Sequence, residues 1–112
     1  MNEKEVSIWM SYDLGVGGDF EGLYAWLDDH GAIECGNNVA HFKYKSAFTT
    51  DKEFAHFLKQ DLTAKVKFTA TNRIYIVRPT ENGKTIGTFI VGKRKASPWE
   101  GFGTKTDNTV DE

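Results

Sequence analysis

The chain has 112 residues, of which 39% are hydrophobic and 13% aromatic, and its formal net charge is −2. This length fits one domain, and the aromatic content allows a small core to form without disulfides or a structural metal. The lone Cys35 excludes an internal disulfide, so we expect a reducing, cytoplasmic location. No apolar run is long enough for a secretion signal or for the roughly 20 residues of a membrane span, so we expect no membrane partner.

Charge is distributed unevenly along the chain. Residues 1–42 contain one lysine and eight acidic residues, whereas residues 43–112 contain thirteen basic and eight acidic residues. The acidic excess falls partly on the first predicted helix, which would therefore repel a nucleic-acid backbone.

An alternating pattern over residues 6–13 predicts a strand with one buried face. The segment GVGG that follows ends this strand and predicts a turn rather than a phosphate-binding loop, because it lacks the spacing of a Walker or dinucleotide motif. The predicted core side chains of the strand are Val6, Ile8, Met10 and Tyr12, and those on its other face are Ser7, Trp9, Ser11 and Asp13.

A helix is predicted to follow this turn. Asp19 fits its N-cap and Gly31 fits its C-terminal stop. The apolar side chains between them recur at helical spacing, so they share one face of the helix. Those predicted to be buried are Phe20, Leu23, Tyr24 and Leu27.

Residues 32–45 predict a β-hairpin around the turn GNN. Ala40, Phe42 and Tyr44 would lie on its buried face. Cys35, in the same segment, is expected to be a small buried residue rather than a nucleophile.

A second helix and two final strands complete the predicted elements. The capping pair Thr50 and Glu53 marks the start of the helix. Residues 65–72 fit either a short edge strand or a connector. Residues 73–79 predict a strand, and an Asn82-Gly83 turn leads into a last strand, TIGTFIVGK. The apolar stripe of the second helix consists of Phe54, Phe57, Leu58 and Leu62.

This order of elements predicts an α+β fold of the ferredoxin-like type, a split βαβ antiparallel sheet with two helices on one face and an added C-terminal strand. We expect one domain over residues 1–103 and a polar, disordered tail over 104–112. An exposed tryptophan on the uncovered face needs a cover, and a second copy of the chain could supply it, so we expect a homodimer. The side chains predicted on that face are Ser7, Trp9, Ser11 and His41.

The stretch SYDLG at the end of the first strand, followed by FEGLYAWL and DHGA, resembles a group of small ferredoxin-like proteins over roughly residues 6–78. The group includes the second CRISPR-associated adaptation protein and virulence-associated protein D. In its nuclease members, an aspartate at the end of the first strand sits at a dimer interface and is implicated in holding a divalent metal. The resemblance implies that Asp13 would hold Mg²⁺ or Mn²⁺ and serve as the catalytic residue of an endonuclease.

Two features depart from that pattern. The first predicted helix is acidic, and no arginine occurs between residues 1 and 72. We therefore expect a non-catalytic, dimeric binding or interaction module without a cofactor, linked by the resemblance to mobile elements or defence systems. Two alternatives stay open: a Mg²⁺- or Mn²⁺-dependent nuclease that uses Asp13, and a regulator that binds nucleic acid.

The segment GKRKASPWEGFG carries the second group of candidate residues. Its basic run could contact phosphates while an aromatic ring stacks on a base. Alternatively, the basic run protects a strand end while the aromatic residues dock into a groove on this chain or on a protein partner. We expect docking. The candidate residues are Lys93, Arg94 and Lys95 for nucleic acid, and Trp9, Trp99 and Phe102 for the interface.

Overall fold

Strand β1 (Lys4–Asp13) is the middle strand of a five-stranded sheet, and it pairs with β3 on one side and with β4 on the other. The computed structural model describes residues 3–104. Its sheet has the order β2-β3-β1-β4-β5, and every neighbouring pair is antiparallel. The other strands are β2 (Ile33–Glu34), β3 (Val39–Ser46), β4 (Arg73–Pro79) and β5 (Thr85–Val91), and the helices are α1 (Phe20–Asp29) and α2 (Asp51–Thr63).

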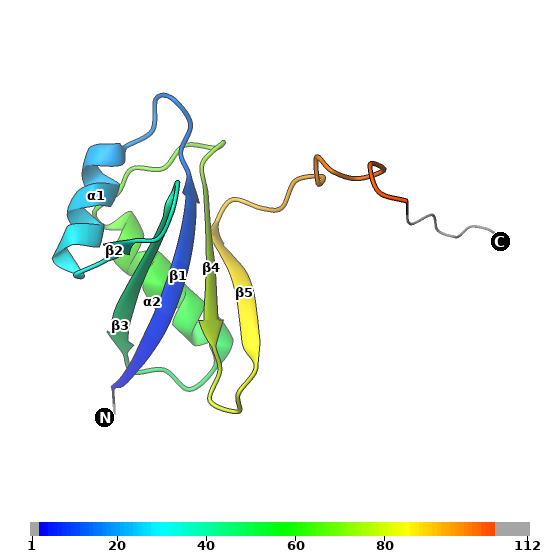
Figure 1. Ribbon diagram of the computed structural model, residues 1–112. Coiled ribbons are helices and arrows are strands. Elements are labelled where there is room, and N and C mark those ends of the chain that lie inside the picture. Colours follow the sequence, from blue (N-terminus) through cyan, green and yellow to red (C-terminus); the bar gives the residue numbers. More distant parts are fainter. Residues whose placement is uncertain (1–2, 105–112) are drawn as a thin grey trace.

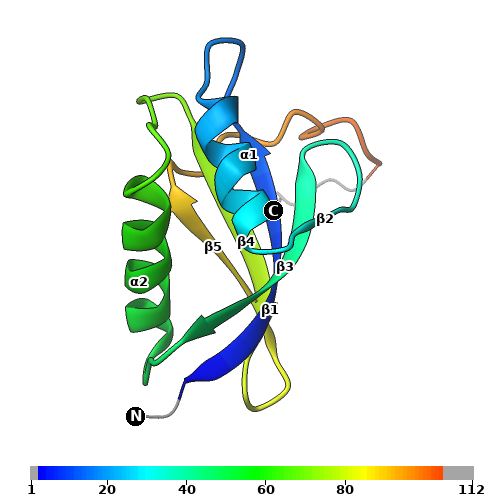
Figure 2. The same cartoon turned by 90° about the vertical axis from the view of Figure 1, so that its left-hand side faces the viewer.

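Both helices pack on the same face of the sheet, and within the described residues no helix covers the opposite face (Figures 1 and 2). The first four strands have the order and the split βαβ connection of a ferredoxin-like fold, and β5 is added beside β4. The predicted α+β class is therefore confirmed. No helix in the described part of the chain is long and apolar enough to cross a membrane.

The hydrophobic core lies between the sheet and the two helices. Strand β1 contributes Ile8 and Met10, which are fully buried, while the alternate side chains face away from the core, as the sequence pattern predicts. Leu23 of α1 and Leu58 of α2 belong to the same core cluster. Burial of each such side chain contributes about 1.5–3 kcal/mol to folding.

The buried face of α1 differs from the predicted one. Tyr24 is 51% exposed, so its predicted burial is wrong, and Trp26 is buried instead. Leu23, Trp26 and Leu27 form the stripe that is buried. Apolar spacing alone could not distinguish the predicted stripe, which includes Tyr24, from the buried stripe, which includes Trp26. Tyr24 lies next to the buried stripe and packs against Phe20.

The predicted hairpin of residues 32–45 is confirmed, but β2 is only two residues long. Cys35, which follows β2, is exposed, so its predicted burial is wrong. The turn that carries it has positive φ angles at Gly36 (126°) and Asn38 (63°). Ile33 pairs with His41 on the sheet face without helices and is 61% exposed, and alternation along the strand places Cys35 on the same side, away from the core.

Residues 65–72 form a connector rather than a strand. Asn72 in this connector is buried, and its side-chain amide donates to the Leu14 carbonyl at 2.8 Å. Its side-chain oxygen accepts from the Thr69 backbone N–H at 2.7 Å. The Asn72 side chain thus supplies hydrogen bonds to the Leu14 carbonyl and the Thr69 N–H, two backbone groups outside the strand pairing. It ties the turn after β1 to the start of β4.

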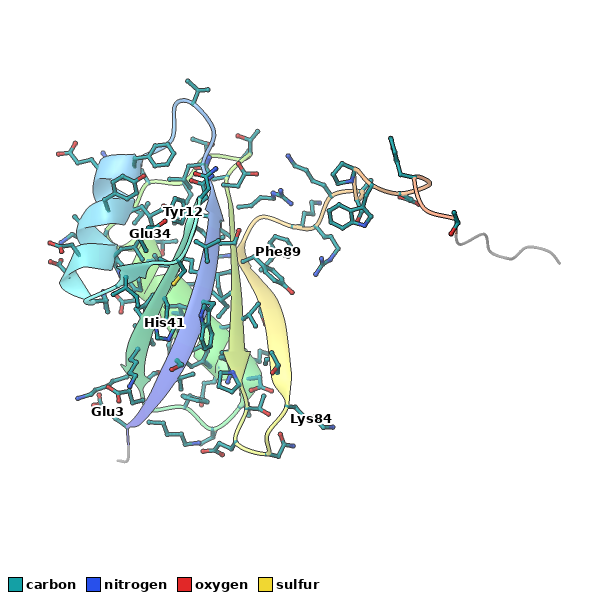
Figure 3. All side chains as sticks on the ribbon, in the orientation of Figure 1. Glu3, Tyr12, Glu34, His41, Lys84 and Phe89 are labelled. Atoms are coloured by element: carbon teal, nitrogen blue, oxygen red, sulfur yellow. The ribbon has the colours of Figure 1, made fainter. Side chains whose placement is uncertain are left out.

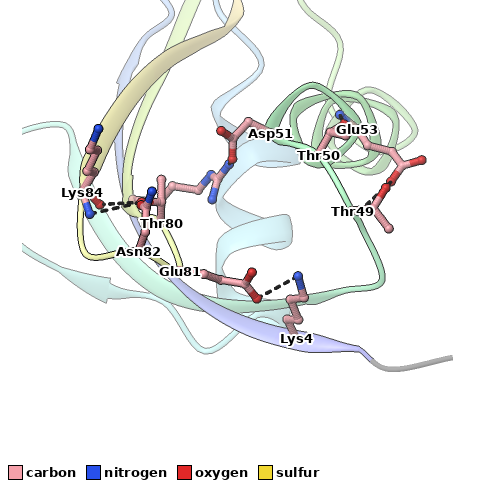
Figure 4. Close-up of polar contacts among 10 residues, drawn as sticks. Lys4, Thr49, Thr50, Asp51, Glu53, Thr80, Glu81, Asn82 and Lys84 are labelled. Atoms are coloured by element: carbon pink, nitrogen blue, oxygen red, sulfur yellow. Dashed lines mark hydrogen bonds and ion pairs between the residues drawn. The ribbon is translucent and has the colours of Figure 1, made fainter.

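Two ion pairs connect neighbouring elements at one end of the sheet (Figure 4). Alternation along β4 turns Arg78 toward the core, where it is buried and pairs with Asp51 at the start of α2. Its guanidinium lies 4.3 Å from the centre of the Phe54 ring. Lys4 pairs with Glu81 at 2.8 Å beside it. A buried charge is tolerated only when it is paired, so Arg78 fixes α2 against β4.

Asp61 of α2 links both helices to the sheet. Its carboxylate accepts from the Trp26 indole N–H of α1 at 3.2 Å and from the Tyr44 hydroxyl of β3 at 2.6 Å. Burial, and then the neighbouring Asp61 carboxylate, hold the pKa of the Tyr44 hydroxyl well above its usual value. The raised pKa is consistent with a hydroxyl that donates to the carboxylate, and this one carboxylate joins three elements.

Replacing Asp61 with alanine should lower the free energy of unfolding by about 2–4 kcal/mol, because two partly buried donors lose their acceptor. Denaturant unfolding followed by circular dichroism measures the change. Gln60→Ala, at the neighbouring exposed position of α2, is the control and should change stability by less than about 0.5 kcal/mol. Equal losses in the two variants would contradict the linking role of Asp61.

Candidate functional site

The sheet face without helices displays aromatic side chains from four strands. Trp9 of β1 is 44% exposed, and its ring centre lies 4.6 Å from that of His41 on β3. Tyr75 of β4 and Phe89 of β5 form a second pair with ring centres 4.7 Å apart. Figure 3 shows this face, with His41 and Phe89 on either side of β1. We call this surface the open face; besides the four rings it includes Ser11, Asp13, Arg73 and Arg94.

The strand register sets these rings in two neighbouring rows. Trp9 lies between His41 on β3 and Val77 on β4. Two residues further along β1, Ser11 lies opposite Tyr75. Residues two apart on a strand share a face and are separated by roughly 7 Å. The two aromatic pairs are therefore separate, and the Trp9 ring of the first pair is exposed to solvent.

Gly87 of β5 allows the Tyr75 ring to lie across that strand. A Cβ atom at Gly87 would come within 1.8 Å of the Tyr75 hydroxyl oxygen. Any other residue would displace the ring, so the aromatic surface depends on a glycine at this position.

Two guanidinium groups cover the second aromatic pair. Arg94 lies 5.5 Å from the centre of the Tyr75 ring and 5.3 Å from that of Phe89. Arg73 lies 5.9 Å from the Phe89 ring centre and pairs with Asp13 at 3.2 Å. These distances are within the range of cation–π attraction. Arg94 has no carboxylate partner among the described residues, so its positive charge is available to bind an anionic ligand.

The second aromatic pair and the two arginines enclose a hollow of about 180 Å³ at the end of β1. This volume is smaller than the roughly 300–1,000 Å³ of pockets that hold drug-sized ligands. The hollow therefore suits one planar group rather than a whole small molecule. Its lining residues are Ser11, Asp13, Arg73, Tyr75, Phe89 and Arg94.

Basic residues gather on the open face, and acidic residues gather on α1. Helix α1 carries Glu21, Asp28 and Asp29 and no basic residue. It lies on the opposite side of the sheet from the open face (Figure 2). The sequence predicts that the acidic residues of α1 repel phosphate, but at the open face this repulsion is weak, because the helix lies on the other side of the sheet. The basic residues of the face are Lys43, Lys45, Arg73 and Arg94, and the acidic ones are Glu5 and Asp13.

Asp13, the candidate metal ligand, is half-exposed at the end of β1. Its Oδ2 atom accepts from Nε of Arg73 at 3.4 Å and from a terminal nitrogen of the same guanidinium at 3.2 Å. Residues 3–104 contain no group of three His, Cys, Asp or Glu side chains placed to hold a metal ion. A metal at Asp13 would need ligands from a second copy of the chain and would compete with Arg73.

The structure separates the three basic residues of the C-terminal segment. All three are exposed, but only Arg94 lies over rings of the open face. Of this contiguous basic run, Arg94 therefore belongs to the aromatic site, and Lys93 and Lys95 are its neighbours along the chain.

Residues 95–104 form an arm that leads away from the sheet (Figure 1). Trp99 and Phe102 on this arm are 72% and 86% exposed, so their predicted docking into a groove on this chain is wrong. Gly92, with a φ of 76°, turns the chain away from the sheet, and a local bond from the Phe102 N–H to the Trp99 carbonyl shapes the arm. Docking on a partner stays a prediction. Most of the predicted tail over 104–112 lies outside the described residues.

A larger hollow of about 680 Å³ lies at the opposite end of the sheet. Its charged lining groups largely neutralise one another, because Arg78 pairs with Asp51 and Lys4 pairs with Glu81. For a charged ligand, the open face is therefore the stronger candidate site, because Arg94 has no ion-pair partner among the described residues.

Sequence reasoning did not select Arg73, Tyr75 or Phe89. Alternation along β4 carried a signal for Arg73 and Tyr75, since both lie on the face opposite Ile74. The position of Phe89 could not be derived in this way, because the pairing of β4 with β5 is irregular between Ile74 and Tyr75.

Comparisons of the chain with protein-family models, with curated proteins and with solved structures returned no significant match. The relationship to the ferredoxin-like nuclease group therefore stays a prediction, and function must be argued from the open face.

Proposed function

We propose that this chain is a non-catalytic binding module that holds single-stranded nucleic acid on its open face. The observation that carries the proposal is the position of Arg94 over the Tyr75 and Phe89 rings, beside the exposed Trp9. Aromatic rings and arginine planes stack on unpaired bases, and the same arginines attract the phosphates.

The arrangement favours a single strand over a duplex. The rings lie against a sheet surface, where they can contact the faces of unpaired bases. Bases in a duplex are already stacked on one another and expose only their edges. Two aromatic pairs in neighbouring rows would accept neighbouring bases of an extended strand.

Charge supports the same ligand. Lys43 and Arg94 border the aromatic pairs, while the acidic residues of α1 lie behind the sheet. Exposed Lys93 and Lys95 extend the positive region beyond β5. A strand that crosses the sheet would therefore meet positive side chains at the border of the rings.

The nuclease alternative has weaker support. The only carboxylate in the hollow is Asp13, and Arg73 already occupies one of its oxygen atoms. The link to mobile elements or defence systems, which rests on the resemblance, and a cytoplasmic location, which agrees with the exposed thiol of Cys35, are part of the same proposal.

A homodimer is the second part of the proposal, and it rests on a different observation. Trp99 and Phe102 are large, exposed rings on an arm that contacts nothing in this chain's core. Aromatic residues are enriched at interface hot spots. We infer that the arm, and not the Trp9 face that the sequence also predicted as part of the interface, packs on a second copy, so that the open face stays free.

Alanine at Trp9 should weaken binding of a fluorescein-labelled oligouridine by about 5- to 150-fold, because base–aromatic stacking contributes about 1–3 kcal/mol per base. Fluorescence anisotropy measures the affinity, which we expect at about 10⁻⁴–10⁻⁶ M at physiological salt. Tyr24→Ala is the matched control, because this ring is similarly exposed but lies on α1. Arg94→Ala should also reduce the slope of log affinity against log salt by about 0.7.

Equal affinity in the Trp9→Ala and Tyr24→Ala proteins would contradict binding on the open face. The oligomer should remain intact after incubation with Mg²⁺ or Mn²⁺. Metal-dependent cleavage that disappears in Asp13→Asn would instead support the nuclease alternative.

Light scattering should give the dimer mass at micromolar concentration for the wild type and the monomer mass for a Trp99→Ala, Phe102→Ala double variant, because interface rings of this kind carry much of the binding energy. Trp9→Asp should remain dimeric, since the open face is not the interface. A monomeric wild type would reject the homodimer. A monomeric Trp9→Asp protein would place the second copy on the open face and contradict its role as a ligand surface.

A further inference from the structure

The hollow at the end of β1 has an aromatic side and a carboxylate end. Tyr75 and Phe89, covered by Arg94, form the side against which a planar ring can stack. Asp13 and Ser11 lie at the same hollow and supply polar atoms. Its volume of about 180 Å³ suits one planar group, such as a nucleobase.

Asp13 is oriented within the hollow by Arg73. Both contacts from Arg73 reach the same carboxylate atom, Oδ2, at 3.4 and 3.2 Å. No hydrogen bond to the Oδ1 atom occurs among the described residues. An ionised carboxylate is an acceptor only, and it can accept several hydrogen bonds. The Oδ1 atom of the half-exposed Asp13 carboxylate can therefore accept a hydrogen bond from a ligand.

The four bases differ in what they offer to such an acceptor. Guanine carries two adjacent donors on its pairing edge, the N1–H and the N2 amino group, which match a carboxylate. Adenine and cytosine each place a ring nitrogen acceptor beside their amino group, and uracil places a carbonyl on each side of its single N–H. These acceptors would be repelled by the carboxylate.

We propose that the hollow is a guanine-selective subsite, in which the base stacks against Tyr75, Phe89 and Arg94 and donates to the Asp13 carboxylate. The inference rests on the proposed function, because it assigns a base to one position of the single strand. It gives Asp13 a role in recognition that requires no metal.

The test uses the full chain and labelled oligouridines that differ only in one central nucleotide. Guanine at that position should bind about ten-fold tighter than adenine, cytosine or uracil, within the range for a base held by two hydrogen bonds. Inosine, which lacks the N2 amino group, should lose most of this preference. Asp13→Asn should reduce the preference to less than about two-fold, because the amide replaces one acceptor oxygen with a donor.

Asp29→Asn is the matched control, because Asp29 is also exposed and forms an ion pair of 3.3 Å, with Lys65, on the helix side. It should retain the guanine preference, and thermal melts of both variants should resemble the wild type. Equal affinity of the wild type for all four oligomers would overturn the subsite while leaving the proposed function intact. Failure to bind any oligomer would overturn both. A preference that survives in Asp13→Asn would overturn the role of this carboxylate.

Discussion

The position of β1 at the centre of the sheet determines both the core and the candidate site. Because successive side chains on a strand point to opposite faces, burial of Ile8 and Met10 under the helices requires Trp9 and Ser11 to face the other way. A slip of one residue would exchange the two sets and expose the core. Both helices cover one face, so the side chains of the other face are available to a ligand.

Charged residues have different roles in the core and on the open face. Buried Arg78 and the Asp61 carboxylate are used to hold the helices against the sheet, through Asp51 in one case and through Trp26 and Tyr44 in the other. On the open face, Arg94 lies over two rings and has no ion-pair partner among residues 3–104. The first kind of pairing contributes to folding, whereas the second leaves a charge that can attract an anion.

The sequence predicted the fold more completely than the site. Alternation along β1, the cap at Thr50 and the Asn82-Gly83 turn are local signals, and the structure confirms the elements that they predict. The site joins residues from β1, β4 and the segment after β5, so it depends on strand order and register, which local patterns do not determine. Arg94 was selected as part of a basic run, but its place beside Tyr75 depends on the sheet.

The most direct test of the account is a titration of the ¹⁵N-labelled chain with oligouridine, followed by the chemical shifts of backbone amides and of the Trp9 indole. If the open face holds a single strand, the largest changes should occur in β1, β4 and β5, around Trp9, Tyr75 and Phe89. The amides of α1, behind the sheet, should be nearly unchanged. Changes that gather on the helices or at the hollow near Arg78, or no changes at millimolar oligomer, would contradict the account.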